Sequence, residues 1–115
     1  DRRAPAAENR TTRAAKDFIE HHLSESLTVG RVAEAVGVSE RTLQAAFQAQ
    51  LGTSPMAYVR AMRLDRVRTE LADAPAGDRL TVTDAALRWG ITHLGRFAGE
   101  YRRRFGESPS ETLRG

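Results

Sequence analysis

Residues 39–48 carry side chains whose types and spacing suit hydrogen bonding to the edges of nucleic-acid bases. Arg41 can donate two parallel hydrogen bonds to guanine, and Gln44 can form a matching pair with adenine. The hydroxyl groups of Ser39 and Thr42 can reach a phosphate or a base edge. Because these groups suit the major groove of double-stranded DNA, the stretch predicts a DNA-reading surface.

A helix must present these side chains on one face. Leu43, Phe47 and Leu51 recur at helical spacing and predict a buried stripe, and Ser39 is a suitable N-cap. Ala45 lies on the outward face, where it lacks a long side chain but can touch a thymine methyl group. The predicted DNA-binding residues of this helix are Ser39, Arg41, Thr42, Gln44, Ala45 and Gln48.

A second candidate helix begins near His93 and has a different outward face. His93 and Arg96 can read bases, whereas Gly95 and Gly99 have no side chains. Each glycine costs a helix about 1 kcal/mol relative to Ala, so the pair indicates either a tolerant surface or close approach to DNA or another helix. The predicted DNA-binding residues here are His93, Gly95, Arg96, Gly99 and Arg102, with Arg103 and Arg104 as further phosphate contacts.

The two candidate helices belong to a repeated segment, Leu27–Pro55 and Leu80–Pro109. Apolar positions match between the copies, and so do the glycines and the Ser-Pro pair that end each copy. Each copy predicts a short helix, a turn at Gly37 or Gly90, and a longer helix, which is the helix-turn-helix pattern. We place the two units at about residues 28–52 and 81–106. Each short helix has a threonine N-cap, Thr28 in the first copy and Thr81 or Thr83 in the second, and a helix start attracts phosphate.

The rest of the chain predicts further helices. A long helix at about residues 54–73 joins the units and carries Arg60 and Arg63, which can contact phosphate or dock this helix onto the units. A closing helix spans about residues 108–113. A first helix begins at Thr11 or Thr12 and ends near Ser24. Residues 1–10 lack apolar periodicity and are interpreted as a linker end that can be disordered, so the DNA-binding domain is placed at residues 11–115. The predicted fold is all-α, with about seven helices.

Trp89 occupies the position in the second copy that Val36 occupies in the first. Because the apolar pattern of the two copies matches, we expect Trp89 to be buried against Phe97 or Tyr101.

Two motifs carry a family resemblance. Gly52, Ser54, Pro55 and Tyr58 form GxSPxxY, and residues 93–114 read HLGRFxxxYRxxFGESPSETLR. With the paired units, they resemble the DNA-binding domain of AraC/XylS-type transcription regulators over about residues 12–114. The resemblance implies base contacts at positions 41, 44 and 45, an N-terminal effector-sensing domain outside this sequence, and a contact with RNA polymerase.

Composition narrows the function classes. The basic residues are 17 Arg and Lys16, and the net charge is +3. Arginine suits phosphate and guanine, although a GC-rich genome also favours it. The sequence has no Cys, no apolar run of about 18 residues for a membrane span, no Gly-rich phosphate loop and no His/carboxylate cluster at ligand spacing. We therefore expect no enzyme activity, metal site, cofactor or membrane association.

The leading hypothesis is a sequence-specific DNA-binding domain that reads two adjacent major-groove segments of a bacterial promoter. The alternative is a helical protein–protein interaction module without specific DNA binding. The sequence begins at Asp1 without Met, so we expect a fragment of a longer protein. We also expect this fragment to be a monomer, located in the cytoplasm and associated with the nucleoid.

Overall fold

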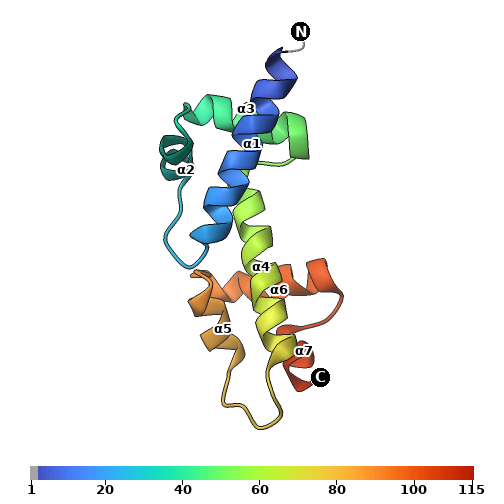
Figure 1. Cartoon of the computed structure of the whole chain (residues 1–115). Helices are drawn as coiled ribbons and strands as arrows, with labels where there is room; N and C mark the ends of the chain where they lie inside the picture. The colour runs from blue at the N-terminus through green and yellow to red at the C-terminus, as the bar shows by residue number, and fades with distance from the viewer. Residues whose placement is uncertain (1–2) are drawn as a thin grey trace. The chain divides into compact units, whose positions relative to one another are not determined.

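The computed structural model describes residues 3–115, in which seven α-helices and no strand are present (Figure 1). The predicted all-α fold with about seven helices is confirmed. The helices are α1 (Arg3–His21), α2 (Val29–Val36), α3 (Glu40–Leu51), α4 (Pro55–Asp73), α5 (Val82–Arg88), α6 (Leu94–Phe105) and α7 (Pro109–Arg114). The chain divides into two compact units inside α4, after Arg60.

The start of α1 differs from the prediction. The helix begins at Arg3, earlier than Thr11 or Thr12, so residues 3–10 are helical, while residues 1–2 lie outside the described part of the chain. The residues after Pro5 are strong helix formers, and a proline in the first turn removes no intrahelical hydrogen bond. Thr12 therefore lies within α1 instead of capping it, and it is 4% exposed.

The first unit packs α1 against α2 and α3. Its largest fully buried side chains include Ile19, Leu23, Leu43 and Phe47. Ile19 belongs to α1, Leu23 follows it, and the other two belong to α3. Leu51 is an exception to the predicted buried stripe, because it is 39% exposed. It is the last residue of α3, where the helix leaves the core.

Local capping defines the helix-turn-helix of the first unit. The Thr28 Oγ1 accepts a hydrogen bond from the Arg31 backbone N–H (N···O 3.0 Å), and the Ser39 Oγ accepts one from the Thr42 backbone N–H (3.0 Å). Gly37 ends α2 with φ of 75°, a conformation that glycine adopts without steric cost. These contacts confirm the predicted caps and place the start of α3 at the turn.

The second unit has its own core, made by Leu64, Val67 and Leu71 of α4, Ala85 and Ala86 of α5, and Phe97 and Tyr101 of α6. Tyr101 is fully buried, and its hydroxyl donates to the Thr112 Oγ1 of α7 (2.7 Å). Its ring meets Phe97 and Phe105 edge to face, with centroids 5.8 and 4.6 Å apart. Tyr101 therefore joins α6 to the closing helix.

Trp89 packs against the core that contains Phe97 and Tyr101, as expected, but it is only partly buried. The residue is the C-cap of α5 and packs at the margin of the second core. Its Nε1 donates to the Glu70 carboxylate (3.0 Å), and the Arg66 guanidinium lies 5.6 Å from its ring centroid. An indole N–H needs a hydrogen-bond partner, and here it is the Glu70 side chain of α4, which is only 17% exposed.

The start of α7 is a capping box. The Ser108 Oγ accepts from the Glu111 backbone N–H (3.1 Å), and the Glu111 carboxylate accepts from the Ser108 backbone N–H (3.0 Å). The hydrogen bond from the Ser108 backbone is the largest cause that holds the pKa of Glu111 below its ordinary value of 4.5, and Arg102 adds to it. A depressed carboxylate pKa stabilises the folded state above that ordinary value, and the contribution is lost as pH falls through the folded-state pKa.

We therefore expect Glu111→Gln to melt below the parent near neutral pH, with a difference that shrinks as the pH falls below 4.5. Thermal unfolding followed by circular dichroism across this range measures the effect. Glu34→Gln is the matched control, because the exposed Glu34 side chain makes no hydrogen bond or ion pair within residues 3–115. A constant difference between Glu111→Gln and the parent at every pH would contradict this account.

Candidate nucleic-acid interface

Helix α3 exposes the predicted base-contacting side chains of the first unit. Leu43 and Phe47 are fully buried and attach the opposite side of the helix to the core. Arg41 forms no hydrogen bond or ion pair within the described residues, so its guanidinium is available to a ligand. The exposed set contains Arg41, Thr42, Gln44, Ala45 and Gln48.

The hydroxyl groups of Ser39 and Thr42 stabilise the start of α3. Ser39 is exposed, and its Oγ both caps the helix and donates to the Thr42 Oγ1 (2.9 Å). The two hydroxyls thus serve the helix start, where unpaired backbone N–H groups attract anions. This geometry presents a positive helix end beside the side chains of Arg41 and Gln44.

Helix α6 exposes the second predicted set, which consists of His93, Gly95, Arg96, Gly99 and Arg102. His93 is the N-cap residue, but its side chain makes no capping hydrogen bond. No described atom lies within 4 Å of the position that a Cβ would take at Gly95. The glycines therefore do not serve close packing against another helix within residues 3–115, and close approach to DNA remains a prediction.

Two of the three consecutive arginines on α6 have acidic partners. The Arg102 Nη2 lies 3.3 Å from the Glu111 Oε1. Arg104 donates from Nε and Nη2 to the two carboxylate oxygens of Asp65, at 2.8 and 3.0 Å, and this hydrogen bonding is the main cause that raises the Arg104 pKa. Arg104 therefore connects α6 to α4, and its guanidinium is already paired, whereas the prediction made it a phosphate contact.

The predicted phosphate contacts have different surroundings. Thr28 and Thr81 are exposed N-caps, and the Thr81 Oγ1 accepts from the Asp84 backbone N–H (3.0 Å). Arg60 is exposed on α4. Arg63 is half-buried, and burial lowers the pKa of its guanidinium. Arg60 is consequently the better placed of the two α4 arginines for a phosphate, and Arg63 has the surroundings of a packing residue.

Within each unit the structure brings the predicted residues onto one exposed helix and the cap that precedes it. The sequence interpretation missed the acidic residues that hold the arginines. Glu111 has a local signal, because it is the fourth residue of a Ser-x-x-Glu capping box. Asp65 has none, since its partner Arg104 is 39 residues away.

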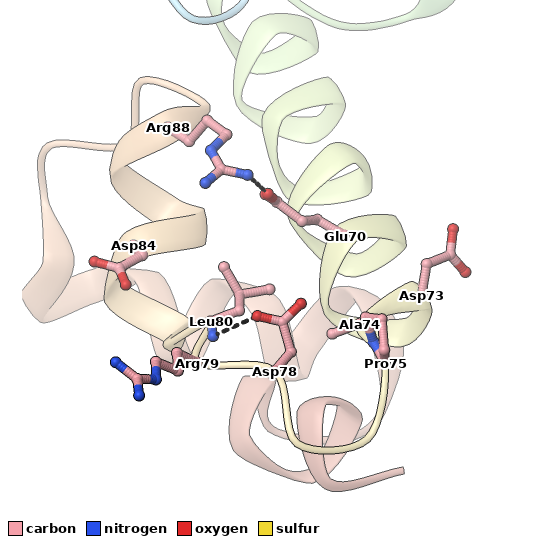
Figure 2. A pocket seen from close by; sticks show the side chains of 9 residues that line it. All are labelled: Glu70, Asp73, Ala74, Pro75, Asp78, Arg79, Leu80, Asp84 and Arg88. Atoms are coloured by element: carbon pink, nitrogen blue, oxygen red, sulfur yellow. Dashed lines mark hydrogen bonds and ion pairs between the residues drawn. The ribbon is translucent and has the colours of Figure 1, made fainter.

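The second unit also contains an open hollow of about 500 Å³ at the end of α4, the following loop and α5 (Figure 2). Two of its carboxylates have internal partners. Glu70 pairs with Arg88, and the Asp78 Oδ1 accepts from the Leu80 backbone N–H (3.0 Å). These contacts connect α4, the loop and α5, so they support the position of the helix that precedes the turn to α6.

Across residues 3–115, no group of three His, Cys, Asp or Glu side chains could hold a metal ion. No helix in this part of the chain is both long and apolar enough to cross a membrane.

Comparison with protein families matches residues 32–115 to a family described as a helix-turn-helix domain. Among curated relatives, the probable thc operon regulatory protein of Rhodococcus erythropolis is 50% identical over 103 residues. That match covers 89% of this chain and 30% of the relative. The chain thus spans less than a third of that relative's length.

Solved structures share this fold. A probable AraC family transcriptional regulator from Rhodopseudomonas palustris has a TM-score of 0.83 and 38% identity, covering 91% of this chain and 95% of that one. The DNA-binding domain of AdpA, a global transcriptional factor solved in complex with a target DNA, has a TM-score of 0.76 over 87% of this chain and 86% of that one. At 23% identity, the second likeness concerns the fold alone.

Proposed function

This chain belongs to the AraC family of transcription regulators, and we propose that it binds promoter DNA sequence-specifically at two adjacent major-groove segments. The observation that carries the proposal is the exposed face of α3. Arg41 and Gln44 stand on it with the geometry of a recognition helix, above a buried side formed by Leu43 and Phe47. Arg41 would pair with guanine and Gln44 with adenine.

The second unit repeats the design with α6. His93 and Arg96 are its exposed polar side chains in the first turn, and helix starts at Thr28 and Thr81 add phosphate contacts. Gly95, which has no described atom within 4 Å of the position that a Cβ would take, would let the first turn of α6 approach the groove. The DNA-binding domain of AdpA, which shares this fold, was solved in complex with a target DNA, and this supports DNA as the ligand.

The wider biological setting is also a proposal. In line with the family resemblance, an effector-sensing domain would lie N-terminal to this chain in the parent protein, and RNA polymerase would be a second partner. The chain alone would be a monomer, located in the cytoplasm with the nucleoid. Without an enzymatic role or a cofactor, its activity would be recognition alone.

Selection of bound sites from random duplexes tests the proposal directly. The expected product is a site with two conserved blocks, one for each recognition helix. Recovery of no shared sequence, combined with binding to a protein partner, would support a helical interaction module instead.

The salt dependence of binding gives a second test. Each phosphate contact adds about 0.9 to the slope of log affinity against log salt concentration, so we expect Arg60→Ala to lower the slope by about one unit on every duplex. Arg104→Ala is the control, because that guanidinium is already paired with Asp65. Fluorescence anisotropy titrations at several salt concentrations measure both. Equal slopes for Arg60→Ala and the parent would remove Arg60 from the interface.

A further inference from the structure

Along the middle of the exposed face of α6 runs a line of positions with few side chains. Gly95, Gly99 and Arg103 are spaced four residues apart, so they follow one another along the same face of the helix. Phe97 and Tyr101, which are buried, lie roughly opposite this line. Arg103 is the only member of the row with a side chain.

The Arg103 side chain extends back along this line. Its Nη1 lies 3.5 Å from the position that a Cβ would take at Gly99, which agrees with the tendency of helical side chains to point toward the N-terminus. The guanidinium therefore lies over the second turn of α6, where a recognition helix presents its base-reading side chains.

Arg103 also differs from its neighbours in its partners. Arg102 pairs with Glu111 and Arg104 with Asp65, whereas Arg103 makes no hydrogen bond or ion pair within residues 3–115. The N–H donors of its planar guanidinium therefore have no acceptor within the described residues. A free guanidinium in this position can meet the O6 and N7 acceptors of guanine.

We propose that Arg103 is a specificity-determining residue that reads a guanine in the second half-site, and that Gly99 provides the space in which its guanidinium lies. The inference rests on the proposed DNA binding. It replaces the expectation from sequence, in which Arg103 is a phosphate contact like the other members of the three-arginine run. Gly95 and Gly99 have no side chain, and the guanidinium of Arg103, one turn further along α6, takes that place.

The test uses the site that the parent chain selects from random duplexes. Each guanine of the second block is replaced in turn by 7-deazaguanine, which lacks the N7 acceptor, and affinities are compared for the parent, Arg103→Ala and Arg102→Ala. At one guanine we expect the parent and Arg102→Ala to lose about tenfold or more, and Arg103→Ala to lose almost nothing further. On the unmodified site, Arg103→Ala should bind about 5- to 150-fold more weakly than the parent.

A second variant separates the position of the guanidinium from its charge. In Gly99→Leu the leucine occupies the surface against which the guanidinium lies, while the net charge is unchanged. We expect Gly99→Leu to lose the preference for that guanine as Arg103→Ala does, with an unchanged first block. Circular dichroism and thermal melting establish that both variants are folded.

The outcomes distinguish the two proposals. If the parent selects no site, the proposed DNA recognition fails, and this inference fails with it. If the parent selects two blocks but the second has no guanine sensitive to Arg103→Ala, DNA recognition stands and Arg103 is not a reader. Equal weakening of specific and scrambled duplexes by Arg103→Ala would likewise overturn the inference and make Arg103 a phosphate contact.

Discussion

Tyr101→Ala is expected to lower the free energy of unfolding of the second unit by about 3–5 kcal/mol, the usual range for truncating a buried aromatic residue to alanine. The ring is fully buried and contacts Phe97 and Phe105. Removing the ring leaves a cavity between α4, α6 and α7. It also removes the hydroxyl that donates a hydrogen bond to Thr112. Small domains have a total stability of about 5–15 kcal/mol, so much of the second unit would unfold.

Tyr101→Phe is the matched control for this prediction. It keeps the ring and removes the hydrogen bond, so it should cost about 0.5–1.5 kcal/mol. The Thr112 hydroxyl retains a contact with Glu107, which limits the loss. Denaturant unfolding gives the free energies, and amide hydrogen exchange shows whether the loss is confined to the second unit. A Tyr101→Ala variant as stable as the parent would show that this ring does not organise the core.

Arg41→Ala is expected to weaken binding to the selected site by about 1–3 kcal/mol and to relax the preference at one or two base pairs of the first block. The reason is that Arg41 is exposed on α3 without an internal partner, while Leu43 and Phe47 hold the helix beneath it. A bidentate contact is lost, but the fold is retained. Repeating the site selection with the variant, followed by affinity measurements on single-base substitutions, gives both the size and the position of the effect.

Arg13→Ala controls for the loss of one positive charge. Arg13 is exposed on α1 and forms no hydrogen bond or ion pair within residues 3–115. We expect it to leave the selected sequence unchanged. If Arg41→Ala and Arg13→Ala weakened specific and scrambled duplexes to the same extent, Arg41 would contribute only charge, and base reading by α3 would be refuted.

The sequence determined the features that depend on neighbouring residues. The threonine and serine caps at Thr28, Ser39 and Thr81, together with the glycines that end the helices, confirm the predicted turns. Apolar periodicity also identified the buried faces of α3 and α6, because a side chain's face on a helix depends only on its position in the repeat. The start of α1 was predicted wrongly because its first turns form through helix propensity without an apolar stripe.

The tertiary structure alone decided how charged and aromatic side chains are used. Arg102, Arg103 and Arg104 are consecutive arginines, yet among the three only Arg103 is without a partner in the described chain. Trp89 is partly buried, and its indole N–H donates to Glu70, 19 residues away. The partner of a long side chain depends on which groups folding brings near it, and the energy of such a contact depends on distance and burial. Periodicity places a residue on a face of its helix, and only the packed fold shows which partner its charge meets there.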